Sequence, residues 1–240
     1  SVQVEAIKNV DTVIFLAELV GDPLCAARPE DALKTNYLAL SSFATLCSYI
    51  GIKRFIYTSS CSVYGNSNNP INLINENSKV NPISHYARIK IMSEKALFLQ
   101  MEKSKNLFSP TILRLGTVFG TSYRNRFDLV VNTFAKNAYF KKKILVNGTG
   151  NQWRPHIHVN DVALGIIKII NSPVEKVEKQ IFNLSNDTQN FTINDIAKQT
   201  KTIFANCKIV TNNQKSVDKR TYKISSKKIK DHINFEAKKT

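Results

Sequence analysis

The stretch RFIYTSSCSVYG, residues 54–65, begins as an apolar run and ends in a cluster of hydroxyl side chains. A short apolar run of this kind is typical of a strand buried on both faces of a parallel sheet. Comparable runs lie at residues 10–17, 111–115, 144–147 and 181–184. Helical patterns alternate with them at residues 29–49, 82–103, 128–138, 161–170 and 192–205, and residues 66–80 are predicted as a loop. This alternation predicts an α/β fold built on a doubly wound parallel sheet.

The composition is that of a globular protein. The chain has 240 residues, of which 42% are hydrophobic and 22% are charged, and this excludes a disordered chain, a collagen and a coiled coil. No apolar run approaches the roughly 20 residues that cross a bilayer, so no membrane partner is expected. The four cysteines form no C-x-x-C and lie near no histidine in metal-ligand spacing. We therefore expect free thiols, no metal site and a cytoplasmic location.

The net charge is +16, and residues 201–240 contain eleven Lys or Arg against three acids. A basic protein attracts phosphate groups on nucleotides, nucleic acids or lipids. We expect the basic C-terminal part to be mainly a solvated surface, with contact to RNA or another polyanion as the alternative. Nucleic acid is thus not the expected partner.

A candidate catalytic pair follows the serine-rich strand end. Tyr86 and Lys90 are spaced i, i+4 in the predicted helix at 82–103, so their side chains share one helix face. A phenol has a pKa of about 10 and is a poor base at neutral pH, but a neighbouring ammonium lowers that pKa. If Ser60 holds a substrate oxygen beside the phenol, the trio is suited to moving a proton on a secondary alcohol while a hydride leaves the same carbon.

The Y-x-x-x-K spacing alone is weak evidence, because it also occurs at residues 49–53 and 139–143. The first of these copies is interrupted by Gly51, and the second lies in a run of lysines. An isolated copy is most often an amphipathic surface pair. Only Tyr86 and Lys90 combine a continuous helix with a serine-rich strand end upstream.

Several further motifs occur in a fixed order along the chain. They are VIFLA (13–17), Asn36, RFIYTSSCSVYG (54–65), YARIK (86–90), LRLGTVFG (113–120), WRPHIHVNDVA (153–163) and DKRTY (218–222). Together they resemble the extended short-chain dehydrogenases/reductases, specifically the NAD-dependent nucleotide-sugar epimerase/dehydratase group. The resemblance implies a Rossmann-type fold, NAD as cofactor with NADP not excluded, and a nucleotide-diphosphate sugar as substrate.

The resemblance also implies roles for individual residues. The implied catalytic residues are Ser60, Tyr86 and Lys90, with Tyr86 as acid/base, Lys90 bound to the nicotinamide ribose and Ser60 bound to the sugar hydroxyl. The implied cofactor-binding residues are Ala17, Asn36, Ser59, Tyr86 and Lys90. The implied substrate-binding residues are Ser60, Thr117, Arg154 and Arg220. The two arginines match positions that contact the nucleotide diphosphate, and a guanidinium fork suits phosphate oxygens.

Two features depart from the family pattern. The glycine-rich dinucleotide fingerprint does not follow the first predicted strand, and the only G-x-G, at residues 148–150, has Trp153 where a third glycine is needed. We therefore expect an N-terminally truncated fragment with one bare sheet edge, and we leave its activity open. Glu18 replaces a small residue of the relatives. Because a carboxylate beside a cofactor phosphate is unfavourable, we expect Glu18 to point away or the cofactor geometry to differ.

The reaction follows from the residues after Ser60. Dehydratases of the group carry Asp-Glu there, whereas this chain has Cys61 and Ser62, which form a poor acid/base pair for eliminating water. This favours a UDP-glucose 4-epimerase-like isomerase, with transient oxidation at sugar C4 and Tyr86 as acid/base. The alternatives are a nucleotide-sugar reductase or 4,6-dehydratase of the same family, or a relative without catalysis that binds RNA.

The resemblance divides the chain into two parts. Residues 1–119 and 159–187 are expected to form a partial NAD-binding Rossmann domain. Residues 120–158 and 188–240 are expected to form a smaller nucleotide-sugar binding region. A homodimer through the helices at 29–49 and 82–103 is a further expectation from the family.

Overall fold

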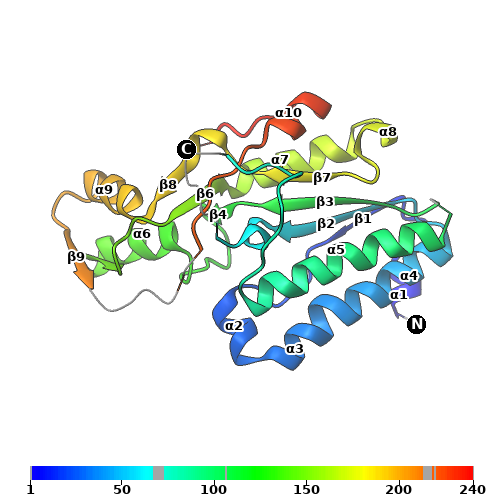
Figure 1. The fold of residues 1–240 in the computed structure, drawn as a ribbon, viewed down its shortest axis with the longest axis horizontal. Helices are drawn as coiled ribbons and strands as arrows, with labels where there is room; N and C mark the ends of the chain where they lie inside the picture. The colour runs from blue at the N-terminus through cyan, green and yellow to red at the C-terminus, as the bar shows by residue number, and fades with distance from the viewer. Residues whose placement is uncertain (1, 67–72, 106, 213–217, 219, 240) are drawn as a thin grey trace.

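The structure is a computed structural model that describes residues 2–66, 73–105, 107–212, 218 and 220–239. The predicted loop at 66–80 thus lies partly outside the described residues, at 67–72. Within the described part, the centre of the molecule is a four-stranded parallel sheet of order β1-β2-β3-β7 (Figure 1). Its strands are β1 (Thr12–Phe15), β2 (Arg54–Ser60), β3 (Ser109–Leu115) and β7 (Ile181–Leu184). The predicted α/β class and parallel sheet are confirmed.

Helices cover both faces of this sheet (Figure 1). One layer contains α4 (Leu40–Ile50), α5 (His85–Lys103) and the short α1 (Val2–Ala6). The other contains α7 (Val159–Ile170), α8 (Val174–Val177) and α10 (Lys227–Ile233). Alternate residues of a strand point to opposite faces, so Phe55 and Tyr57 pack in the core of the first layer while Ile56 packs in the core of the second.

The helix boundaries follow from local chemistry. Between α3 (Pro29–Leu33) and α4, residues Lys34–Ala39 form a π-helix, and the whole segment ends at Gly51, whose φ of 92° is left-handed. Glycine adopts such a backbone without a steric penalty, as a helix C-terminus requires. α5 begins after Ser84, whose hydroxyl accepts a hydrogen bond from Ala87 N at 3.2 Å, and not at Pro82 as predicted.

A smaller lobe lies beyond the carboxyl ends of the central strands (Figure 1). It contains a three-stranded sheet of β4 (Thr117–Phe119), β6 (Trp153–His158) and β8 (Asn190–Thr192). It also contains the parallel pair β5 (Lys143–Asn147) and β9 (Lys208–Asn212), with α6 (Val130–Lys141) and α9 (Ile193–Ile203) packed on it. The predicted start signal of α9 is confirmed, because Thr192 and Asp195 form a reciprocal capping box.

The outer side of β1 lies beside an apolar groove of about 520 Å³. Within the described residues β1 pairs with β2 alone, so it is an edge strand of the central sheet. The exposed fractions of Ile14 and Leu16 are 40% and 60%. Ala17 lines this groove. A search of the described residues finds no helix that is both long and apolar enough to cross a membrane.

Candidate active site

A cleft of about 960 Å³ lies at the carboxyl ends of β1, β2 and β3, and residues of the central sheet and of the smaller lobe line it. This volume is at the upper end of the range of roughly 300–1,000 Å³ for small-molecule sites. Ligands of doubly wound sheets bind at this edge. Most of the site residues predicted from the sequence line this cleft, namely Ser59, Ser60, Tyr86, Lys90, Thr117, Arg154 and Arg220.

Tyr86 and Lys90 lie in the first turns of α5, on the face toward the cleft. The Lys90 ammonium lies 5.5 Å from the centroid of the Tyr86 ring and 4.7 Å from that of Tyr57. Lys90 Nζ donates to Thr58 O at 2.5 Å, which ties the N-terminal part of α5 to the end of β2. The shared helix face that the sequence predicted thus brings the phenol and the ammonium to one site.

Glu18 changes the electrostatics of this pair. Its carboxylate forms an ion pair with Lys90 and accepts a hydrogen bond from Tyr57 Oη at 2.8 Å, and the Lys90 and Glu18 side chains are each only 2% exposed. The expectation that Glu18 points away from the site is therefore wrong. Burial, and next the charge of Glu18, raise the pKa of Tyr86 well above its usual range, so the expected lowering by Lys90 is also wrong.

Ser60 ends β2 and caps a short 3-10 helix, Cys61–Tyr64, by accepting a hydrogen bond from Ser62 N at 3.2 Å. Both serines line the cleft. Ser62 is 2% exposed, and its hydroxyl oxygen has no hydrogen-bond partner among the described residues. A buried hydroxyl without a partner is costly, so this oxygen is suited to a polar group of a ligand. Sequence reasoning considered Ser62 only as a replaced dehydratase residue.

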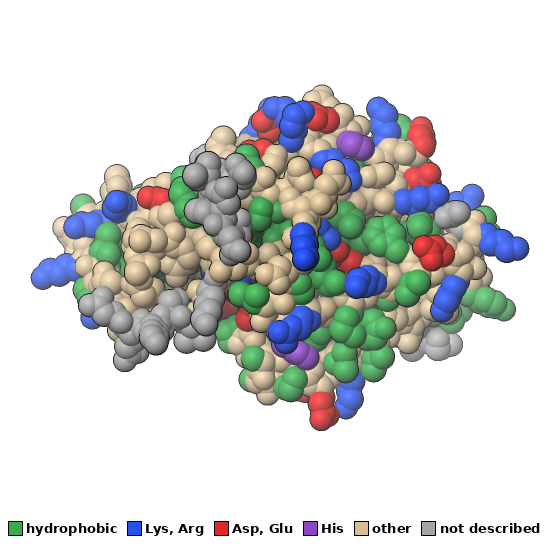
Figure 2. Space-filling model, in the orientation of Figure 1, with side chains coloured by type: hydrophobic (Ala, Val, Ile, Leu, Met, Phe, Trp, Pro, Cys, Tyr) green, Lys and Arg blue, Asp and Glu red, His purple; other side chains and the backbone are tan. Residues whose placement is uncertain are grey.

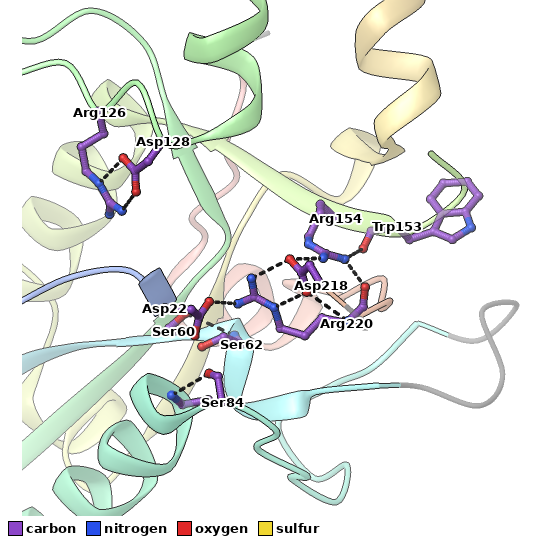
Figure 3. Close-up of polar contacts among 11 residues, drawn as sticks. Asp22, Ser60, Ser62, Ser84, Arg126, Asp128, Trp153, Arg154, Asp218 and Arg220 are labelled. Carbon is purple, nitrogen blue, oxygen red and sulfur yellow. Dashed lines mark hydrogen bonds and ion pairs between the residues drawn. The ribbon is translucent and has the colours of Figure 1, made fainter. Parts of the chain in front are cut away.

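Arg154 of β6 and Arg220 approach the cleft from the smaller lobe and share one carboxylate (Figure 3). Asp218 Oδ2 lies 2.7 Å from Arg154 Nη2 and 2.7 Å from Arg220 Nη2. Arg220 Nη1 also reaches Asp22 Oδ2, at 2.6 Å, across the cleft. Burial opposes ionisation of Asp218, but its hydrogen bond and charge contacts with the two arginines hold its pKa well below the usual range.

Arg126 and Asp128 form a further ion pair at the cleft, between β4 and α6 (Figure 3). A Cβ atom at Gly21 would lie 2.7 Å from Arg126 Nη2, so a larger residue would require the guanidinium to move away from the loop after β1. Gly21 also has a φ of 95°, which disfavours other residues. Sequence reasoning missed these residues, and Asp22, because none belongs to a motif that it used.

The charges of the cleft balance. Its charged lining residues are four cations and four acids, namely Lys90, Arg126, Arg154, Arg220, Glu18, Asp22, Asp128 and Asp218. Each cation is bound to at least one of the acids. The excess of +16 therefore lies outside the cleft, and on the face shown in Figure 2 the Lys and Arg side chains are spread between acidic and apolar ones.

Two predicted cofactor residues lie outside this cleft lining. Ala17 lines the groove beside β1. Asn36 is fully buried, and its side-chain amide pairs with the backbone of Leu19, accepting from the N–H at 2.8 Å and donating to the carbonyl at 2.7 Å. Asn36 thus holds the loop that contains Glu18. Ser59 lines the cleft and donates to Glu94 at 2.5 Å.

Comparisons with known proteins show the family of the chain. The profile of the NAD-dependent epimerase/dehydratase family matches residues 2–185. The chain belongs to this family. Its relatives include an uncharacterised protein of Methanocaldococcus jannaschii, 29% identical over 181 residues that make up 75% of this chain and 52% of the relative. The UDP-glucuronate 4-epimerase of Thermodesulfobacterium geofontis is 26% identical over 191 residues, 78% of this chain and 55% of the relative.

The fold of this family member matches solved structures over its whole length. The UDP-glucose 4-epimerase of Thermotoga maritima superposes with a TM-score of 0.89 at 20% identity, over 100% of this chain and 76% of that one. At this identity the likeness shows the fold. The chain spans about half the length of the curated relatives it matches. Within the described residues, no cluster of His, Cys, Asp and Glu side chains is placed to hold a metal ion.

Proposed function

We propose that this family member is a nucleotide-sugar 4-epimerase in which Tyr86 exchanges a proton with the sugar 4-hydroxyl. The supporting observation is the meeting of Ser60, Tyr86 and Lys90 with Arg154 and Arg220 in one cleft. A phenol, a hydroxyl and an ammonium serve proton transfer at an alcohol. Two guanidinium groups at the other side of the same cleft suit a diphosphate.

The nicotinamide end of an NAD site fits the residues present. An ammonium has three N–H donors, and Glu18 and Thr58 O accept two of those of Lys90 among the described residues, so one is left for a ribose hydroxyl. We assign Lys90 and Ser59 to that end of the cofactor. When bound, NAD supplies hydride acceptance and return at the sugar carbon. Because the sequence contains no glycine-rich fingerprint, the proposal assigns only the nicotinamide and sugar ends of the site to this chain.

The chain's own residues then divide the remaining work. Tyr86 takes the proton from the sugar O4 as C4 is oxidised and gives it back after the 4-keto sugar has turned over. Ser60 Oγ hydrogen-bonds the same oxygen, and Ser62 Oγ binds a neighbouring hydroxyl. Arg154 and Arg220 hold the diphosphate. To bind it, they release the carboxylates of Asp218 and Asp22, with which they are paired in this structure.

Dehydration is less well supported than epimerisation. Cys61 is buried, its thiol donates to Arg114 O at 3.1 Å, and burial raises its pKa well above the usual range. A neutral thiol that is engaged with the backbone does not protonate a leaving hydroxyl efficiently. The assignment of residues 1–119 and 159–187 to cofactor binding, and of 120–158 and 188–240 to substrate binding, belongs to the same proposal.

We further propose a homodimer through α4 and α5. Apolar side chains gather over these helices on the face shown in Figure 2. On α5, Met92 and Leu99 are 40% and 56% exposed. Light scattering at increasing protein concentration tests this proposal, and a mass that stays monomeric would contradict it. All four cysteines are free and buried, which fits the reducing cytoplasm that we propose as the location.

The catalytic proposal is tested with NAD⁺ and UDP-glucose or UDP-glucuronate, with the 4-epimer followed by NMR. Removal of a general acid/base lowers turnover by about 100-fold or more, which is the effect expected for Tyr86→Phe. Tyr139→Phe is a matched control, because Tyr139 carries the same i, i+4 lysine but is 59% exposed outside the cleft lining. Its turnover should stay within about twofold of the starting value. Equal activities of the two variants would show that Tyr86 is not the acid/base.

A further inference from the structure

Glu18 occupies a position that nothing in the proposed reaction requires. It follows β1 and enters the cleft lining beside Lys90. Its carboxylate has two partners, the Lys90 ammonium and the Tyr57 hydroxyl, and the Tyr57 side chain is fully buried. A buried charge is costly unless it is paired and hydrogen-bonded, as Glu18 is here. The Asn36 amide hydrogen-bonds the backbone N–H and carbonyl of Leu19, which fixes the residue next to Glu18.

The other charged groups around Tyr86 and Lys90 have partners elsewhere. The titratable and charged groups that face the two residues are Glu18 after β1, Asp22 and Cys25 of α2 (Asp22–Ala27), Tyr57 of β2, Glu94 of α5, and Arg126 before α6. Asp22 is bound to Arg220, Glu94 to Arg114, and Arg126 to Asp128. Burial raises the pKa of Cys25 to about 11, so its thiol is neutral at pH 7. Glu18 is thus the acid whose charge is balanced by Lys90.

We propose that Glu18 is a positioning residue that keeps both protons on the Tyr86/Lys90 pair, because it holds the ammonium in place and offsets its charge. This inference rests on the proposed role of Tyr86 as acid/base. Two neighbouring groups that share protons lose them in steps that belong to the pair. The Glu18 carboxylate opposes the lowering of the Lys90 pKa by burial, and its charge adds to the raising of the Tyr86 pKa, so it favours the ammonium and the phenol. Without Glu18, the ammonium has lost its counter-ion, and one proton leaves the pair more easily, from either residue.

For catalysis, the protonation of the pair decides whether Tyr86 is ready to remove a proton from the sugar or to donate one. Oxidation of the sugar needs a deprotonated Tyr86, whereas return of the proton needs the phenol. A pair that keeps both protons therefore oxidises the alcohol faster as the pH rises, by up to about tenfold for each pH unit below the transition. Glu18 shifts this site toward proton donation at neutral pH.

The test uses ¹³C NMR of the 240-residue chain without sugar or cofactor, with the tyrosine Cζ and lysine Cε signals of the pair assigned by Tyr86→Phe and Lys90→Arg. In the starting protein burial lowers the pKa of Lys90 and the charge of Glu18 opposes that shift, so the pH of the first proton loss serves as the reference. In Glu18→Gln one of the two signals should titrate at a pH lower than this reference by about one unit or more, because the ammonium has lost its counter-ion. Unchanged titration of both signals in Glu18→Gln would overturn the proposal.

Two further variants keep the test decisive. Asp31→Asn removes an acid outside the cleft lining whose partner is Arg28, and it should leave the pair's titration unchanged. An equal shift in this variant would overturn the specific role of Glu18. If Glu18→Gln does not fold, Glu18→Asp retains the charge and withdraws it by one methylene, so a smaller shift in the same direction is expected and its absence counts against the proposal. Because no substrate is present, failure of turnover and failure of this inference remain distinguishable.

Discussion

Two buried ion pairs lie one helical turn apart on α5 and differ in what surrounds them. Lys90 pairs with Glu18 at the cleft, whereas Glu94 pairs with Arg114 behind it. Arg114 binds Glu94 through two nitrogens, with Nε at 3.0 Å and Nη2 at 2.6 Å, and donates from Nη1 to Tyr64 Oη at 3.1 Å. Ser59 also donates to Glu94.

The two pairs differ in their further hydrogen bonds: the Glu94–Arg114 pair belongs to a closed network, whose partners are all protein groups, whereas the Lys90–Glu18 pair is open to the cleft. The Glu94–Arg114 network continues through Tyr64 to Asn183 of β7, at 2.7 Å, and so joins α5 to the sheet. Lys90 and Glu18 line the cleft, and among the described residues the Lys90 ammonium donates to two of its possible three acceptors. We infer that the first pair serves the architecture and the second serves the chemistry.

The largest expected effect is a loss of stability when a substitution breaks the closed network around Glu94 and Arg114. Arg114→Met leaves Glu94 buried without its cation, and such a change costs about 3–5 kcal/mol of unfolding free energy. Urea denaturation measures this cost. Arg28→Met is the control, because the Arg28–Asp31 pair is 58% and 44% exposed and contributes less than about 1 kcal/mol. Similar losses in both variants would show that the network is not what stabilises α5 on the sheet.

A double-mutant cycle sharpens the comparison. Glu18→Gln or Lys90→Met alone leaves one buried charge and is expected to cost about 3 kcal/mol. The double variant leaves none, so it should be more stable than either single one. For Glu94→Gln with Arg114→Met the recovery should be smaller, because Ser59 and Tyr64 lose their charged partners as well. Additive losses in the first cycle would contradict the open-pair interpretation.

The smallest expected effect concerns Asp218. The folded pKa of this carboxyl is lower than its unfolded value of about 3.9, so its stabilising contribution is complete above that value and is lost as the pH falls. Asp218→Asn should therefore destabilise the protein slightly at pH 7, by less than about 1 kcal/mol since the side chain is 40% exposed, and by a smaller amount near pH 3, which lies below the unfolded pKa. Thermal unfolding at both pH values checks this. A difference that grows toward low pH would refute the assigned sign.

Much of the central sheet was predictable because its signals are local. The strand at 181–184 and the capping box at Thr192 come from runs and spacings within a few residues, and the structure has both. The elements α2, β8, β9 and α10 were not predicted, since each is too short to show a clear apolar period.

The site shows the same division. Sequence alone determined that Tyr86 and Lys90 share a helix face and that Ser60 ends a strand, because helix and strand periods are set by the backbone. Only the tertiary structure decided the electrostatics. It places Glu18 against Lys90 across 72 positions of the chain and Asp22 against Arg220 across the cleft. Charges act through space and not along the chain, so the partner of each charged side chain follows from the packing of the elements and not from the motif that contains it.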